Sequence, residues 1–310
     1  MDRFRATVGA PELVGKPGTT LRLTQCRAQI HFLNGFRALD LAQMNGMILA
    51  LDWVVGRTHR IWGSAVMVAP GVALTAGHVV AEMRRKGFLQ EVGGYLLALG
   101  FHEDHMVIWN PNSFTSVGNG DLSILTLARA TESDPAASQE ISVKVATMAA
   151  RQPGIGERVS LVGFAASETE FELLTHDRSA GLSLVGSIGA VLEVYSAGRD
   201  RNLPNPSAAV AAKTVGGMSG GAAFDELGRL IGVISTGMGE DTSFISLCWP
   251  SAFTPVENAW PSGLIQMPAT LHSMALQGLC GIEHIEALSS HIGANGEPVV
   301  GLTHDLGRHS

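Results

Sequence analysis

The strongest constraint on the fold is a long succession of short apolar runs, each closed by a turn rich in glycine or proline. The chain has 310 residues, including 37 glycines and 13 prolines, which favours many short strands over long helices. Strand-like runs recur along both halves: 47–55, 61–69, 72–75, 95–99, 106–109 and 122–127, then 158–164, 182–195, 222–224, 230–235 and 244–249. Short strands at this spacing predict a β-barrel or a β-sandwich.

Helical spacing is confined to a few segments. After His78 the sequence VVAEMRRKG predicts one or two helical turns, with basic residues near the last turn and Gly87 as the stop. Residues 270–279 and 282–291 also have helical spacing. They predict a helical tail that packs on the core, with a separate interaction module as the alternative.

Composition and charge exclude several classes of protein. The net charge of −7 argues against a nucleic-acid-binding protein. No apolar run is long enough to span a bilayer, and the first residues lack the apolar stretch of a signal peptide. Cys26, Cys248 and Cys280 are odd in number and widely spaced, so we expect free thiols and a cytoplasmic protein. No spacing of the histidines requires a metal.

Two segments carry residues suited to acid–base chemistry. In LTAGHVV, residues 74–80, a strand delivers His78, and imidazole is the side chain that best serves as a base near neutrality. In NGDLSIL, residues 119–125, Asp121 precedes an apolar strand, where its carboxylate can accept the Nδ1 proton of a histidine. Taken singly, each also fits a structural role: a histidine that ends a strand, and an aspartate in a turn.

A third segment, VGGMSGGA at 215–222, crowds glycines on both sides of Ser219. A sharp turn there would project the Ser219 hydroxyl outward and aim the amides of Gly217 and Ser219 at one point, which glycine dihedrals allow cheaply. The alternative is an ordinary glycine-rich turn. A phosphate-binding loop is poorly supported, because no Lys-Ser/Thr pair follows the glycines.

The segments LTAGHVV, NGDLSIL and GGMSGGAAF, taken together in this order, resemble the trypsin/chymotrypsin superfamily of serine proteases, including its bacterial branch. Residues 154–164 resemble the first strand of the family's second barrel, and 230–237 the strand that lines its cleft. The resemblance covers about residues 46–252. It covers neither end, and it implies an all-β fold of two six-stranded antiparallel barrels of the chymotrypsin type, with a short helix after the histidine. To this fold the helical spacing of the tail adds a helical C-terminal extension.

The same resemblance implies roles and boundaries. It makes Ser219 the nucleophile, His78 the general base and acid, and Asp121 the residue that orients His78, with an oxyanion hole from the amides of Gly217 and Ser219 and no cofactor. We expect an N-terminal extension (1–45), a first barrel (46–135), a second barrel (136–252) with residues 131–139 as a linker, and a C-terminal extension (253–310).

The resemblance also locates a substrate pocket. Its base should lie near Lys213 and Thr214, with walls from 235–237 and 240–243. Lys213 either favours an acidic residue before the cut or extends to solvent and leaves an apolar pocket; we favour the second. Ser235, Thr236 and Gly237 should pair with an extended peptide as an added strand, which favours a peptide or protein substrate.

Departures from the family pattern leave alternatives open. Met218 stands where trypsin-like zymogens carry the aspartate that binds a new N-terminus, so activation by that route is not expected. We therefore weigh a serine endopeptidase against a binding or scaffold protein that kept the fold. A third candidate is a latent protease in a stress or defence pathway, switched on by a regulatory protein that binds one of the extensions.

Overall fold

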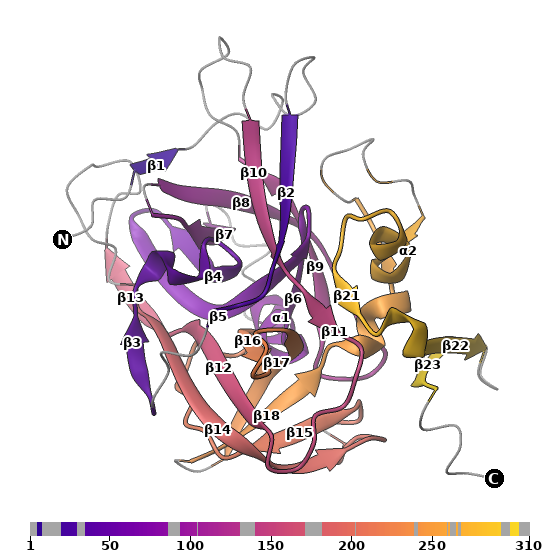
Figure 1. Cartoon of the computed structure of the whole chain (residues 1–310). Helices are drawn as coiled ribbons and strands as arrows, with labels where there is room; N and C mark the ends of the chain where they lie inside the picture. The colour runs from indigo at the N-terminus through magenta and orange to yellow at the C-terminus, as the bar shows by residue number, and fades with distance from the viewer. Residues whose placement is uncertain are drawn as a thin grey trace.

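The computed structural model describes residues 5–7, 20–29, 35–85, 94–103, 105–130, 140–170, 182–201, 203–238, 241–258, 260, 265, 268–292 and 298–303. Its main elements are two β-sheets, each closed on itself (Figure 1). No helix within these ranges is both long enough and apolar enough to cross a membrane.

The first sheet forms a six-stranded antiparallel barrel. Its strands are β4 (Ile48–Val55), β5 (Thr58–Ala69), β6 (Val72–Thr75), β7 (Gly94–Phe101), β8 (His105–Ser116) and β9 (Ser123–Arg129). They follow the order β8-β7-β4-β5-β6-β9, and the pairing of β8 with β9 closes the barrel. Two strands are added at its margins: β1 (Arg5–Thr7) runs parallel to β8, and β13 (Ser167–Glu170) pairs antiparallel with β5.

The second sheet repeats this plan. Its strands are β12 (Arg158–Phe164), β14 (Leu184–Tyr195), β15 (Ser207–Val210), β16 (Ala222–Phe224), β17 (Leu230–Met238) and β18 (Thr242–Leu247). The order β16-β12-β14-β15-β18-β17 closes through β16 and β17. β3 (Arg37–Leu39) pairs with β14, and β11 (Met148–Ala149) runs parallel to β17. Two six-stranded antiparallel barrels were expected, and the fold confirms them.

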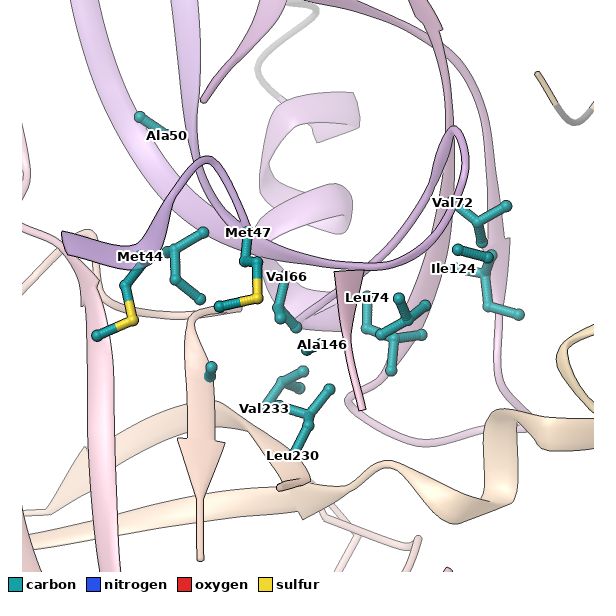
Figure 2. Packing of buried hydrophobic residues seen from close by; sticks show 14 of the residues in the cluster. Met44, Met47, Ala50, Val66, Val72, Leu74, Ile124, Ala146, Leu230 and Val233 are labelled. Carbon is teal, nitrogen blue, oxygen red and sulfur yellow. The ribbon is translucent and has the colours of Figure 1, made fainter. Parts of the chain in front are cut away.

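The two barrels share an apolar, buried interface (Figure 2). Val66 of β5 and Leu74 of β6 belong to the same buried cluster as Leu230 and Val233 of β17, and all four are fully buried. Val66 and Leu74 are directly opposite each other in the register of β5 and β6. On β17 a bulge between Leu230 and Gly232 places Leu230 and Val233 on one face although they are an odd number of residues apart. Burying a side chain of this size is worth about 1.5–3 kcal/mol, so the interface holds the barrels in a fixed relation.

Helices are short. α1 (Gly77–Arg85) follows the first barrel's third strand as expected, while Gly87 lies outside the described residues. 3₁₀ turns occupy η2 (Leu41–Met44) and η3 (Trp249–Phe253). In Figure 1, α1 lies in the middle of the molecule, where the barrels meet.

The C-terminal extension is helical only in part. α2 (Leu271–Leu276) confirms the first expected helix, and β19 (Pro255–Val256) pairs with β20 (Ala269–Thr270) before it. The helix expected over 282–291 is wrong. The segment contains β21 (Ile282–Glu283), the turn η4 (Ile285–Ala287) and β22 (Leu288–Ile292), which pairs with β23 (Pro298–Leu302). His284 has a left-handed φ of 62° that stops any helix there, and pairing with other strands outweighs the helical spacing.

Both extensions are joined to the barrels. β2 (Thr20–Cys26) runs parallel to β10 (Glu140–Ala146), and β21 runs parallel to β11 in the second sheet. Arg27 and Arg229 both bind the Glu283 carboxylate, and Arg229 also binds the buried Asp225 at 2.7 Å. The linker expected at 131–139 lies outside the described residues. The domain boundaries stay a prediction, although β21 shows that the tail is part of the second sheet.

Candidate active site

His78 and Asp121 meet because two paired strands deliver them. His78 follows β6 at the start of α1, Asp121 stands just before β9, and these strands are neighbours in register, with Thr75 opposite Ser123. The His78 Nδ1 atom lies 2.9 and 3.0 Å from the two Asp121 carboxylate oxygens. The backbone N–H of His78 also donates to Asp121 Oδ1 at 2.6 Å. The carboxylate thus fixes both the position and the tautomer of the ring.

Asp121 has a second partner in Ser235, whose hydroxyl donates to Asp121 Oδ2. Burial alone would raise the pKa of Asp121. The hydrogen bonds from His78 and Ser235 and the attraction of His78 outweigh burial, so the pKa lies below its usual value. Asp121 is therefore an anion at neutral pH, 8% exposed and fully engaged by donors.

The loop around Ser219 has the geometry that its glycines predict. Gly217 and Gly220 have φ values of +88° and +83°, a region that other residues rarely adopt. A Cβ at Gly220 would lie 2.1 Å from the Ser64 carbonyl oxygen, so only glycine fits. Within the described part of the chain, the amides of Gly217 and Ser219 donate to no protein acceptor. These two amides are available to an external oxyanion.

The Ser219 hydroxyl donates to the Ser235 carbonyl at 2.9 Å, not to His78. Ser219 and His78 nevertheless line the same cleft, which has a volume of about 530 Å³. The Ser219 hydroxyl must turn from the Ser235 carbonyl toward the ring before His78 can take its proton. Such bonds often form only once substrate is bound.

The cleft lies at the junction of the barrels. Arg60, Ile61 and Trp62 of β5 form one side, and Ala166, Ser167 and Gly216 from the second half of the chain form another. None of the described residues after 252 lines it. In Figure 1 the tail lies on the right flank, whereas β13 lies on the left.

Of the residues expected to form the specificity pocket, Thr214, Thr236 and Gly237 lie near one another, whereas Lys213 points elsewhere. Thr236 and Gly237 are exposed on β17, where a register shift relative to β18 frees the strand for a further pairing. Thr214 lies opposite, with its hydroxyl 2.8 Å from Ser243 Oγ. Lys213 is exposed, and its ammonium lies over the Phe36 ring at 5.7 Å. Glu240, the first residue of the second expected wall, lies outside the described residues.

Sequence reasoning missed several neighbours of the site. It assigned Ser235 to substrate contact only, although a serine directly after the apolar run 230–234 can be buried and would then need a hydrogen-bond partner. Trp62 and Ser64 carry no motif that would have marked them. In the described ranges, no three side chains of the metal-binding types His, Cys, Asp and Glu come together.

Comparison with solved structures finds several proteases at low identity. The chain is similar to the Rv3671c protease from M. tuberculosis in its active form, with 13% identity, a TM-score of 0.44 and coverage of 81% of this chain and 88% of that one. It is similar to Deg5 (16%, TM-score 0.43, 65% and 83%) and to the HtrA-type protease AlgW with a decapeptide (17%, 0.41, 75% and 54%). No curated protein matches the sequence.

Comparison with family models identifies the family to which the chain belongs. The model described as a trypsin-like peptidase domain matches residues 63–233, more than half of the chain. This segment includes His78, Asp121, Ser219 and most of both barrels. The chain therefore belongs to the trypsin-like peptidase family of serine proteases.

Proposed function

We propose that this protein is a serine endopeptidase that cleaves peptide bonds through an acyl-enzyme on Ser219. The observation that supports this most is that His78, held by the buried Asp121, lines the same cleft as Ser219. Two amides with no protein acceptor in the described chain lie beside them. Each group has the chemistry that amide hydrolysis requires.

In the proposed reaction His78 takes the proton of Ser219 as its hydroxyl attacks the substrate carbonyl. The oxyanion rests on the amides of Gly217 and Ser219. His78 then gives its proton to the leaving amine, and water releases the acyl group with His78 again as base. Asp121 stabilises the imidazolium through the bond of 2.9 Å to Nδ1. No cofactor takes part in this scheme.

The substrate is proposed to extend to both sides of Ser219. The part before the cut pairs with Ser235, Thr236 and Gly237 on β17 as an added strand. The part after the cut enters the cleft, because the leaving amine takes its proton from His78, which lines it. Because Lys213 faces Phe36 and solvent, we propose a pocket without an acidic preference, bordered by Thr214.

Covalent labelling tests the proposal. A fluorophosphonate probe should label the folded protein at Ser219, and Ser219→Ala should abolish the label while leaving the thermal midpoint in place. Cleavage of a mixed peptide library by the wild type should then identify the residue before the cut. Failure to label the folded wild type, with or without peptide, would remove the proposed activity.

A latent protease is a second candidate, and one observation favours it. The Ser219 hydroxyl is held by the Ser235 carbonyl, an acceptor that a paired substrate strand would also use. The Ser219 hydroxyl would then exchange between a state bonded to the Ser235 carbonyl and a state bonded to His78. A regulatory protein that binds an extension would activate the enzyme by favouring the second state. Labelling that rises when the protein is mixed with peptide would support latency; equal labelling would favour a constitutively active enzyme.

We also propose a cytoplasmic location. All three cysteines are free, and burial raises the pKa of Cys248 to about 12, which leaves its thiol unreactive. Free thiols are typical of reducing compartments. Fractionation of cells that produce the protein tests this directly, and recovery outside the cytoplasmic fraction would contradict it.

A further inference from the structure

The loop that carries the two candidate oxyanion amides is held by partners from both barrels. On the first-barrel side the partner is Ser64 of β5, which is fully buried. Its hydroxyl donates to the Gly217 carbonyl at 2.9 Å and accepts the backbone N–H of Phe164 at 2.8 Å. Its own backbone N–H donates to the Ser219 carbonyl at 2.8 Å. One residue of the first barrel thus binds two carbonyls of the loop and one amide of β12.

On the second-barrel side the partner is Ala166, whose N–H donates to the Gly216 carbonyl at 2.6 Å. A peptide unit is planar and trans, so its C=O and N–H point in opposite directions. Holding the Gly216 carbonyl against Ala166 therefore turns the Gly217 N–H away from Ala166. The approach is close: a Cβ at Gly217 would lie 2.3 Å from Ala166 N, so the loop packs directly on this amide.

The position of Ala166 is itself set by the opposite barrel. Ala166 immediately precedes β13, and β13 pairs with β5 of the first barrel from Ser167 opposite Ile61 to Glu170 opposite Thr58. Ser64 lies three residues beyond Ile61 on the same strand. Both hydrogen-bonding contacts to the loop therefore depend on the position of β5: Ser64 belongs to β5, and Ala166 is held beside β5 by the pairing of β13.

We propose that Ser64 and the N–H of Ala166 are positioning groups that lock the oxyanion loop, so that the Gly217 amide faces the bound carbonyl. This rests on the proposed peptidase function and deepens it. Within the described chain, neither group hydrogen-bonds to His78 or Asp121. Their loss should lower the rate of the chemical step without altering the acid–base behaviour of the histidine.

Ser64→Ala tests the first group, with Ser160→Ala as its matched control. Ser160 is also a buried serine, on β12, and its hydroxyl has no partner among the described residues. With a fluorogenic peptide chosen from the wild-type cleavage library, Ser64→Ala should lower kcat by about 10–100-fold, below the loss of a whole oxyanion donor. KM should stay within about twofold, and the pH midpoint of kcat should not move. Ser160→Ala should keep the wild-type kcat.

Replacing one atom tests the second group even if Ser64→Ala fails to fold. Lactic acid incorporated at position 166 by nonsense suppression in cell-free translation exchanges the N–H of Ala166 for oxygen. This ester should lower kcat by at least about tenfold. Alanine installed at position 166 by the same suppression keeps the N–H and should give the wild-type kcat.

These experiments distinguish failure of the positioning role from failure of the proposed peptidase function. Wild-type kcat in both the ester and Ser64→Ala, or an equal loss in Ser160→Ala, would overturn the positioning role while the labelling of Ser219 leaves the peptidase intact. A wild-type protein that neither labels nor cleaves would instead count against the proposed function.

Discussion

Replacing Asp121 by asparagine perturbs the site at its most constrained point. The backbone N–H of His78, 2.6 Å from Oδ1, admits an oxygen there but not an amide NH₂. The NH₂ of the substituted side chain would therefore occupy the Oδ2 position, 2.9 Å from His78 Nδ1 and beside the Ser235 hydroxyl. It would donate to Nδ1, which favours the tautomer with its proton on Nε2. That tautomer cannot accept the proton of Ser219.

Two losses add in the Asp121→Asn variant: the wrong tautomer is favoured, and the negative charge beside the imidazolium disappears. For a triad of this arrangement the combined effect is about 10⁴-fold in kcat, or about 5.4 kcal/mol of barrier. The size and shape of the side chain are unchanged, so the fold should survive.

The measurement is the second-order rate of fluorophosphonate labelling, which needs no knowledge of the natural substrate. Asp52→Asn is the matched control: Asp52 is also buried, lies 2.6 Å from His59 Nδ1, and accepts the backbone N–H of Arg60 at 3.1 Å. Asp52→Asn should label within a few-fold of the wild-type rate, at the cost of some stability. A folded Asp121→Asn protein that keeps more than about a tenth of the wild-type rate would refute the assignment of Asp121.

Three further predictions concern the loop, an ion pair and pH. Gly220→Ala forces a Cβ to within 2.1 Å of the Ser64 carbonyl at a φ of +83°, so labelling and the thermal midpoint should both fall; retention of both would contradict the packing of the loop. Asp225→Ala removes the carboxylate that pairs with Arg229 in a largely buried site and should cost about 3–5 kcal/mol in urea unfolding; a change below about 1 kcal/mol would be inconsistent with that burial. Burial alone would raise the pKa of both Asp121 and Asp225, but hydrogen bonds and opposite charges bring each pKa below its usual value. Their contribution to stability is therefore full above the unfolded value of about 3.9 and is lost as pH falls through the lower folded values; a thermal midpoint unchanged between pH 7 and pH 3 would rule this out.

The turn around Ser219 and the strand-end places of His78 and Asp121 could be predicted, because short local motifs indicate them. A glycine with positive φ has few substitutes, so the crowd of glycines around Ser219 specifies a sharp turn wherever the chain places it. His78 and Asp121 stand at the ends of apolar strands, and the pairing of those strands brings them together.

The hydrogen bonds around the site could not be predicted, because they depend on tertiary placement. Ser64 lies in an apolar strand with no motif, and its partners come from β12 and the Ser219 loop, far along the chain. The rotamer of Ser219, directed at the Ser235 carbonyl, likewise depends on packing. In the tail, the spacing of Ile282, Ile285 and Leu288 fits a helix, and only the pairing partners of β21 and β22 decide otherwise.

The parallel pairing of β11 with β21 has a consequence for biosynthesis. Met148 lies opposite Ile282, so nearly half of the chain is translated between the two partners. Until the last segment leaves the ribosome, β11 offers an unpaired edge, and contacts this distant in sequence form slowly. A recombinant fragment ended near residue 252 would keep that edge exposed permanently, a condition that promotes aggregation.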